Sequence, residues 1–192
     1  MTGRVLFEKY WWCINLLCKI TLILPYSVRL WIFNHLRNVQ GMLGFLLRYV
    51  FIFNLVKSCG KNVRICTGVI FEQVSGLSIG DNVSINQYCV LIASGGIKIG
   101  NNVSLAHNCS LVSESHTWSD NSIPICYNPI IDTPITIEDD VWLGCGVRVI
   151  GPCKISSRII IAAGAVVKGV LESGFIYGGI PGKRIKKIID RN

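Results

Sequence analysis

The sequence predicts a β-solenoid, a fold in which short strands wind around a triangular prism. A pattern of glycine, two polar residues and valine recurs at a spacing of twenty residues, at positions 60–65, 80–85 and 100–105. Between these markers a large aliphatic residue opens each unit of six. A period of six matches neither a helix nor a simple alternation, and three sixes make one turn of a three-sided prism.

Stacked coils explain which residues the repeat prefers. Coils that lie directly on one another form ladders of like aliphatic side chains inside the prism, and a tight corner four positions later admits only a small residue. The aliphatic positions are Ile79, Ile85, Leu91, Ile99, Leu105, Leu111, Ile137, Leu143, Val149, Ile155, Ile161 and Val167. The small positions are Val69, Ser75, Val83, Cys89, Val103, Cys109, Ser115, Val141, Val147, Cys153 and Ala165. A β-sandwich is the alternative, but sandwich strands do not keep a fixed six-residue phase.

Residues 1–58 form a separate segment that is both basic and apolar. They carry seven Lys or Arg against the single acidic residue Glu8, so +6 of the net charge of +8 lies here. We expect helices at about 8–24, 26–38 and 40–56. Basic residues among aromatic and aliphatic ones favour contact of residues 1–56 with an anionic membrane surface, and predict no nucleic-acid partner.

No apolar run in this segment reaches the roughly eighteen residues of a spanning helix, and no signal-peptide cleavage site follows an apolar core. The helices could instead cap the open end of the solenoid, which must be covered against edge pairing. The two roles are compatible.

The nine cysteines predict no metal site, because no Cys-x-x-Cys occurs and no Cys and His stand at zinc-site spacing. Cys89, Cys109 and Cys153 occupy small corner positions, where a thiol acts as a small apolar side chain. Many free thiols fit a reducing cytoplasm.

The hexads stop after residues 111–116 and resume at Ile135 or Ile137. We therefore expect a β-helix domain at 59–182 with an inserted loop at 117–134, followed by a basic tail at 183–192. A long loop within a regular scaffold often carries function. His116 stands at its entrance, and an imidazole is the natural general base near neutral pH. A surface histidine held by the loop is the alternative.

Asn86 opens a corner of the coil below the one that leads to His116. An amide at that position could stabilise an oxyanion. It could equally be a corner asparagine chosen for its backbone conformation. His107 is expected to face outward as part of the wall.

Several motifs occur in a fixed order along the chain: the hexads, Ser115-His116, the run IEDDVWLG at 137–144, AAGAVV at 162–167 and GIPGK at 179–183. Over about residues 59–187 this set resembles the hexapeptide-repeat O-acetyltransferases, and most closely the galactoside, maltose and colanic acid acetyltransferases. The resemblance implies a left-handed parallel β-helix with an N-terminal α-helical segment and a short C-terminal tail. It also implies acetyl-CoA as co-substrate and a homotrimer whose active site lies between two subunits.

By the same resemblance His116 is the catalytic base and Asn86 the oxyanion donor, which also contacts substrate. Ser94 stands where relatives carry an acceptor-binding aspartate, so the acceptor differs or is bound differently. Residues that match the family's acetyl-CoA contacts are Trp142, Cys145, Ala163, Lys168, Gly169, Lys183 and Lys186. The family has Thr-Lys where this chain has Lys168-Gly169. In the family, the positions of His116 and Asn86 lie on one side of the site and the C-terminal coils lie opposite.

These expectations describe an O-acetyltransferase that acts on a sugar hydroxyl in surface polysaccharide or lipid-linked oligosaccharide. We expect it in the cytoplasm, at the inner face of the cytoplasmic membrane where residues 1–56 reach it. Serine or an antibiotic as acceptor, and a β-helix scaffold without activity, are the alternatives. A β-helix carbonic anhydrase needs three histidine ligands in the coils, and only His107 and His116 lie there.

Overall fold

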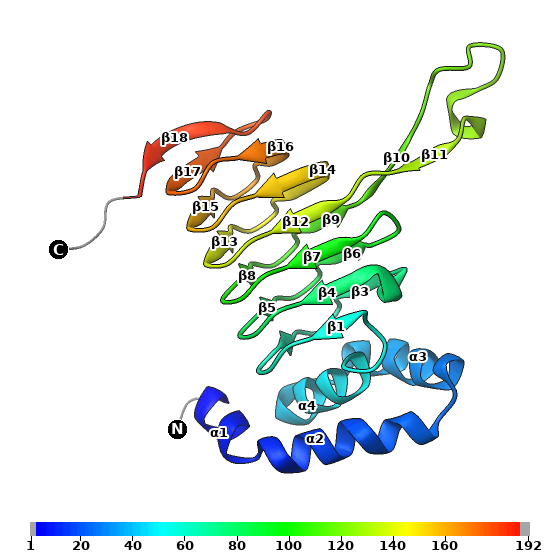
Figure 1. Cartoon of the computed structure of the whole chain (residues 1–192), viewed down its shortest axis with the longest axis vertical. Coiled ribbons are helices and arrows are strands. Elements are labelled where there is room, and N and C mark those ends of the chain that lie inside the picture. The colour runs from blue at the N-terminus through cyan, green and yellow to red at the C-terminus, as the bar shows by residue number, and fades with distance from the viewer. Residues whose placement is uncertain (1–2, 189–192) are drawn as a thin grey trace.

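The computed structural model describes residues 3–188 and is a parallel β-solenoid of about six coils, capped at its N-terminal end by helices (Figure 1). The predicted fold class is therefore confirmed. The strands pair in parallel from coil to coil, with steps of twenty residues in the early coils and eighteen later. These are the spacings on which the prediction depends.

The helical segment contains four α-helices and two short 3-10 turns. The helices are α1 (Gly3–Lys9), α2 (Trp11–Ile20), α3 (Tyr26–His35) and α4 (Gly41–Ile52), and the turns are η1 (Thr21–Ile23) and η2 (Leu36–Asn38). The expected helices at 8–24, 26–38 and 40–56 correspond to α2 with η1, α3 with η2, and α4. The additional helix α1 precedes them, and Tyr10 separates it from α2.

Three faces and three corners make up the prism. The first face contains β1 (Ser58–Cys59), β4 (Leu77–Ile79), β7 (Ile97–Ile99), β12 (Ile135–Ile137) and the second halves of β14 (Arg148–Ile155) and β16 (Val166–Leu171). The second face contains β2 (Arg64–Ile65), β5 (Ser84–Ile85), β8 (Ser104–Leu105), β13 (Val141–Leu143), β15 (Ile159–Ile161), β17 (Phe175–Gly178) and the antiparallel β18 (Lys183–Lys187). The third face contains β3 (Ile70–Glu72), β6 (Val90–Ile92), β9 (Ser110–Val112) and the first halves of β14 and β16.

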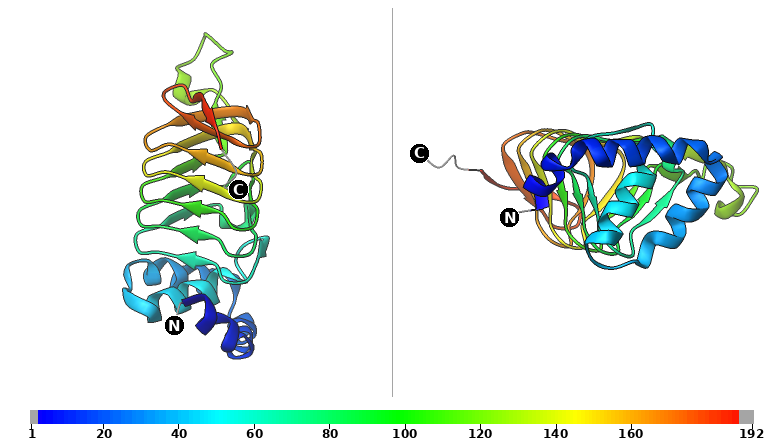
Figure 2. Two further views of the ribbon diagram at one scale, coloured as in Figure 1. Left: turned by 90° about the vertical axis from the view of Figure 1, so that its left-hand side faces the viewer. Right: turned by 90° about the horizontal axis from the view of Figure 1, so that it is seen from below.

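We call the turn between the first and second faces the first corner, that between the second and third faces the second corner, and that between the third face and the next coil the third corner. Figure 2 shows the prism end-on and from the side.

Inside the prism the predicted aliphatic positions are buried and stack in register, as in the ladder Ile79, Ile99, Ile137 and Ile155. Two of the predicted small corner positions are wrong. Ser75 is exposed because the 3-10 turn η3 (Val74–Gly76) turns Val74 inward in its place. Ser115 is outside the prism, because the chain leaves the third corner before it.

The recurring asparagine of the repeat marks the first corner. Asn62, Asn82 and Asn102 all have φ near +57°, a left-handed conformation that asparagine tolerates. Their side chains form a column, in which Asn62 donates to Asn82 at 2.8 Å and Asn82 donates to Asn102 at 3.2 Å. The column explains why the motif repeats without change of residue.

Helix α4 closes the N-terminal end of the prism, so the predicted cap is present. Arg48 is only 1% exposed and donates from Nε to the carbonyl of Ile65 at 2.9 Å, which joins the helix to the first coil. Its Nη1 donates to the carbonyls of Leu36 at 3.0 Å and Val39 at 2.6 Å. Although the sequence counts Arg48 among the basic residues of this segment, its charge lies inside the fold.

Helix α2 is the outermost of the helices (Figures 1 and 2). It carries an exposed apolar stripe of Trp12, Leu16, Ile20 and, just beyond it, Ile23. The spacing of four, four and three residues places these side chains on one side of the helix. Among the described residues no helix has the length and apolar character to cross a membrane.

Candidate active site

An arm of residues 113–133 leaves the third corner and projects away from the prism (Figure 1). Its strands β10 (Glu114–His116) and β11 (Ile130–Asp132) pair antiparallel, and a 3-10 turn, η4 (Ile125–Tyr127), lies near its tip. The sequence placed the start of this insertion at residue 117. The antiparallel pair β10–β11 begins three residues earlier, at Glu114. For that reason His116 lies on the arm and not at the edge of the prism.

The root of the arm is tightly packed. Ser113 is buried and donates from Oγ to the carbonyl of Ile92 at 2.8 Å, while the Thr133 amide donates to the carbonyl of Ser113 at 2.8 Å. Glycines lie below and above. A Cβ on Gly95 would come within 2.1 Å of the Ser113 carbonyl oxygen, and one on Gly151 within 1.8 Å of that of Thr133. These glycines let the backbone of the arm pass between two coils.

Asn128 holds the tip of the arm together. Its side chain is 3% exposed, accepts from the Asp120 amide at 3.0 Å, and donates to the carbonyls of Asp120 at 3.2 Å and Pro124 at 3.3 Å. The Thr117 amide donates to the carbonyl of Pro129 at 2.9 Å and ties the residue after His116 to the returning strand.

His116 lies opposite Ile130 in this ribbon and is exposed. Its imidazole makes no hydrogen bond within residues 3–188. An exposed imidazole without such a bond can donate to or accept from a bound molecule.

Asn86 lies at the second corner, just after β5, and its amide is held on two sides. Nδ2 donates to the carbonyl of Leu105 at 2.7 Å, and Oδ1 accepts from Arg64 Nη2 at 3.3 Å and from the Cys66 thiol at 3.6 Å. An amide nitrogen carries two hydrogens, so one donor remains available for a ligand.

The candidate residues fall into two groups within one chain. Asn86, Cys145 and Ala163 lie on the second corner, where backbone bonds join successive coils, such as Gly146 to His107 and Gly164 to Cys145. Ser94, His116, Lys168 and Gly169 lie on or beyond the third corner.

The third face separates the two groups. Asn86 precedes β6 and His116 follows β9, and these strands pair in parallel, so the two residues belong to opposite ends of that face. The resemblance placed His116 and Asn86 on one side. Within one chain Asn86 lies on the same corner as Cys145 and Ala163, because a corner keeps its identity from coil to coil.

Trp142 and Lys186 belong to a row of outward-facing residues on the second face. Neighbours in this row are paired in the sheet, and it reads Arg64, Ser84, Ser104, Trp142, Ile160, Ile176 and Lys186. Trp142 is 52% exposed and lines a hollow of about 270 Å³ with Ser104 and Ile160. Lys183 is exposed and lies opposite Gly178 in β18. The expected basic tail is thus a strand of the second face as far as Lys187.

Sequence reasoning missed Arg64 as a neighbour of Asn86 and His107 as a member of the second corner. Both could have been found from the register, since residues one coil apart are about twenty positions apart and Cys66 lies twenty before Asn86. His107 is exposed on the same corner as Asn86 and Cys145.

Within residues 3–188 no group of three His, Cys, Asp or Glu residues is placed to hold a metal ion. Cys89, Cys109 and Cys153 are buried at their corners, as small apolar side chains would be. Burial raises the pKa of Cys153 to about 12, so this thiol stays protonated at neutral pH.

Solved structures with the same fold are hexapeptide-repeat acetyltransferases. A Vibrio cholerae member in complex with acetyl-CoA has a TM-score of 0.75 at 24% identity, covering 85% of this chain and 87% of that one. A maltose O-acetyltransferase from Clostridium difficile has a TM-score of 0.75 at 24% identity, with coverage of 85% and 86%. A galactoside acetyltransferase in complex with coenzyme A has a TM-score of 0.73 at 20% identity, with coverage of 86% and 83%. These likenesses establish the fold, and they agree with the resemblance drawn from the motifs.

Curated relatives matched by sequence are acetyltransferases as well. A putative acetyltransferase of Saccharomyces cerevisiae is 39% identical over 59 residues, which are 31% of this chain and 30% of the relative. A 2,3,4,5-tetrahydropyridine-2,6-dicarboxylate N-acetyltransferase of Clostridium perfringens is 35% identical over 63 residues, or 33% and 27%. The matched segments thus span less than a third of these relatives. No family model matches the chain.

Proposed function

We propose that this protein is an acetyl-CoA-dependent O-acetyltransferase that acts on a sugar hydroxyl, with His116 as general base, at a site completed by a second copy of the chain. The observation that carries the proposal is the separation of an exposed His116, on an arm, from Asn86 on another corner. Solved neighbours of this fold include sugar acetyltransferases and one with bound acetyl-CoA.

The chemistry requires a base and an oxyanion donor but no protein nucleophile. The acceptor oxygen attacks the thioester carbonyl while the His116 imidazole takes its proton. The second hydrogen of Asn86 Nδ2 stabilises the negative oxygen of the tetrahedral intermediate. That intermediate collapses, the carbon–sulfur bond breaks, and the proton on the imidazole passes to the departing sulfur. The acceptor leaves as an ester and coenzyme A leaves as a thiol.

The donor is assigned to the second corner and second face. Trp142 offers an exposed ring, and Cys145 and Ala163 belong to stretches of the second corner, 144–146 and 162–165, where small side chains leave room for a narrow chain to lie. Lys183 and Lys186 in β18 supply cations for the phosphates of coenzyme A. Lys168 and Gly169 lie on the third corner, as His116 does, so in an assembled site they contact the donor from the neighbouring copy.

A homotrimer brings the two groups together. Contact of the third corner of one copy with the second corner of the next is head to tail, and such contacts close into a ring when the rotation allows. The arm exposes large apolar side chains, as expected of a surface covered in an assembly. These are Trp118, Ile125, Tyr127, Ile130 and Ile131.

We assign the acceptor to surface polysaccharide or lipid-linked oligosaccharide, made at the inner face of the cytoplasmic membrane. The apolar stripe on α2, flanked by the exposed Lys9 and Lys19, suits an anionic membrane surface. Ser94 is half-buried on the third corner, one coil below the arm, and is the candidate acceptor contact.

Radiolabelled acetyl-CoA and a panel of acceptors test the proposal. The panel contains lipid-linked oligosaccharide, maltose, a β-galactoside, serine, chloramphenicol and an amino sugar. We expect transfer to a sugar hydroxyl and a loss of about 10²-fold or more in His116→Ala. His35→Gln, which alters an exposed histidine of α3, is the matched control. Equal turnover by wild type and His116→Ala contradicts the assignment of the base, and transfer only to serine, chloramphenicol or the amine contradicts that of the acceptor.

Membrane contact has its own test. We expect the full chain to sediment with vesicles that contain anionic lipid, and the double variant Trp12→Ser/Ile23→Ser to lose most of this binding. Val170→Ser changes an equally exposed apolar residue far from α2 and is the control. Binding that is unchanged in the double variant means that α2 does not face the membrane.

A further inference from the structure

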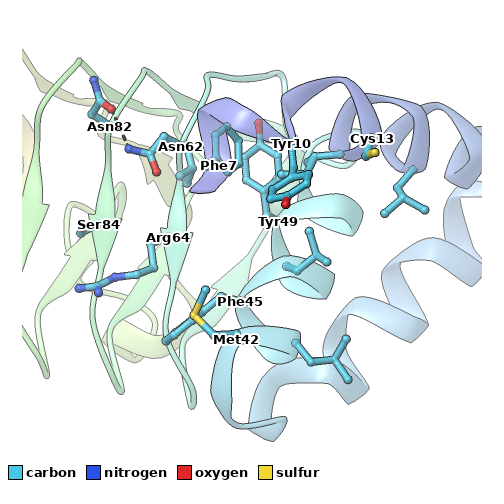
Figure 3. Close-up of a pocket in the computed structure, with 15 residues that line it drawn as sticks. Phe7, Tyr10, Cys13, Met42, Phe45, Tyr49, Asn62, Arg64, Asn82 and Ser84 are labelled. Atoms are coloured by element: carbon cyan, nitrogen blue, oxygen red, sulfur yellow. Dashed lines mark hydrogen bonds between the residues drawn. The ribbon is translucent and has the colours of Figure 1, made fainter. Parts of the chain in front are cut away.

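A large groove lies between helices α1, α2 and α4 and the lower part of the second face (Figure 3). Its volume is about 1210 Å³, and small-molecule pockets in proteins are usually ~300–1,000 Å³. None of the functions assigned above uses this space. We propose that the groove binds a lipid phosphate, with the hydrocarbon chain between the helices and the phosphate at Arg64.

The helical end of the groove is mostly apolar. It is lined by Ile14 and Leu17 of α2 and by Leu43, Phe45 and Leu46 of α4. Tyr10, Cys13 and Tyr49 also line this end, but the rest of its lining is apolar, so a hydrocarbon chain is the ligand chemistry that gains most from burial in it. Met42 and Leu43, at 65% and 62% exposed, leave the groove open at its edge for a long chain to enter.

The other end of the groove is polar and cationic. Arg64, Ser84, Asn62 and Asn82 line it from the second face and the first corner. Among the described residues that line the groove there is no Asp or Glu. A guanidinium with hydroxyl and amide groups beside it, without an opposing carboxylate, is suited to a phosphate.

Arg64 stands at the boundary between the two ends. Its guanidinium lies over the ring of Phe45 at 5.8 Å, and one nitrogen donates to Asn86 Oδ1 at 3.3 Å. The ring and the amide fix the orientation of the guanidinium, and its remaining N–H groups can bind an anion. A neutral lipid or an apolar helix would leave this cation without a counter-charge.

The groove leads directly to the candidate active site. Arg64 bonds to Asn86, and along the outward row it is three strand steps from Trp142, or roughly 14 Å at the usual strand spacing. A phosphate held by Arg64 therefore places whatever is attached to it beside Asn86. This inference rests on the proposed function and deepens it, because it names the acceptor as a glycan carried on a lipid phosphate.

Calorimetric titration of the full chain with dodecyl phosphate, below its micelle concentration, tests the inference. We expect saturable binding of one molecule per chain, weakened about tenfold or more in Arg64→Gln. Leu43→Glu adds a charge at the edge of the groove without disturbing a buried residue, and should also weaken binding. The matched controls Arg37→Gln and Val170→Glu alter exposed residues outside the groove and should bind as wild type does. Thermal unfolding of each variant shows that it is folded.

Two further ligands separate the contributions of head and chain. Inorganic phosphate at the same concentration should not displace dodecyl phosphate, and dodecyl maltoside should bind at least tenfold more weakly. Equal binding of the neutral amphiphile, no effect of Arg64→Gln, or no saturable binding at all would each overturn the inference.

Acetyl transfer to a soluble sugar reports on the proposed function independently. Acetyl transfer without binding of dodecyl phosphate contradicts only the lipid site, and the proposed function is retained. Binding of dodecyl phosphate without transfer to any acceptor supports the lipid site but contradicts the proposed acetyltransferase function.

Discussion

A Cβ atom on Gly151 would lie 1.8 Å from the carbonyl oxygen of Thr133. Thr133 is where the arm re-enters the prism, and Gly151 is at the same corner one coil further on. The position of His116 therefore depends on a contact between two backbone segments far from the ring itself.

Gly151→Ala should reduce acetyl transfer more than it reduces stability. Backbone cannot yield as a flexible side chain can, so the root of the arm must shift, and a displacement of about 1 Å can cost ~10²-fold in rate. Rates of acetyl transfer and thermal unfolding are measured together. Thr136→Ala, on the outside of β12, should leave both near wild type. If Gly151→Ala transfers acetyl at the wild-type rate, the arm does not position the base.

Asn86 can be tested by removing its donor while keeping its shape. Asn86→Asp retains the size of the side chain but places oxygen where Nδ2 donates, and Asn86→Ala removes both groups. We expect kcat to fall about 10²–10³-fold in each. Asn101→Ala, an exposed asparagine at the first corner, is the control. Wild-type kcat in Asn86→Asp would mean that Asn86 serves only the corner backbone.

Arg48 links the helical cap to the first coil, so its loss should show in stability. Arg48→Met keeps apolar volume but leaves the carbonyls of Ile65, Leu36 and Val39 without their donor. The free energy of unfolding in urea should fall by about 3 kcal/mol. Arg37→Met, at an exposed site, should change it by no more than about 0.5 kcal/mol. If Arg48→Met also changed the free energy of unfolding by no more than about 0.5 kcal/mol, water would satisfy the three carbonyls in its place.

The regular part of this fold was predictable because a solenoid repeats its constraints. Each coil requires the same residue types at the same positions of the repeat. The spacing of Ile79, Ile99, Ile137 and Ile155 is therefore enough to predict that they form one ladder. The repeat predicted Ser75 and Ser115 wrongly. A 3-10 turn at Ser75 and a strand that leaves the prism at Ser115 interrupt the six-residue repeat, and the amino-acid composition there gives no sign of it.

The division of the candidate residues between two corners was not predictable from the motifs. His116 and Asn86 are thirty residues apart and both lie at strand ends, and the resemblance grouped them. The corner that each residue occupies follows from how many strands precede it in its coil. For His116 this requires knowing that the arm starts at residue 113, after β9. The groove was equally hidden, because it arises where helices pack beside the second face.

Buried thiols should make the protein sensitive to alkali. In the native chain the pKa of Cys153 is raised by burial to about 12, from 9.0. Between these values the unfolded chain releases a proton that the native chain keeps, so stability is full below about pH 9 and falls as the pH rises towards 12. Each pH unit in that window costs about 1.4 kcal/mol per thiol.

Cys153→Ala should therefore make the decline of the free energy of unfolding in urea shallower between about pH 9 and 10.5, the lower half of that window. Its absolute stability is lower at every pH, because a buried side chain is shortened, so the slope is the quantity to compare. Cys126→Ala, in the exposed part of the arm, should keep the wild-type slope. An unchanged slope in Cys153→Ala would mean that this thiol does not contribute to the alkaline decline.

Mixing two inactive variants distinguishes a site between copies from a site within one chain. If the third corner of one copy meets the second corner of the next, each active site takes His116 from one chain and Asn86 from the other. A site in a mixed assembly is intact when its arm comes from Asn86→Ala and its corner comes from His116→Ala. Random assembly of equal amounts then gives about one intact site in four, whatever the ring size.

We expect the two variants, unfolded together and refolded, to recover about a quarter of wild-type acetyl transfer, although each alone is inactive. Refolding them separately and mixing afterwards is the control, and it should recover nothing unless subunits exchange. The triple variant Trp118→Ser/Tyr127→Glu/Ile130→Glu should prevent both assembly and recovery, since it places charge on the exposed arm surface that we propose a neighbouring copy covers. No recovery from co-refolded variants that do assemble would mean that each site takes His116 and Asn86 from the same chain, because a site shared between neighbouring copies is intact at least once in every mixed ring.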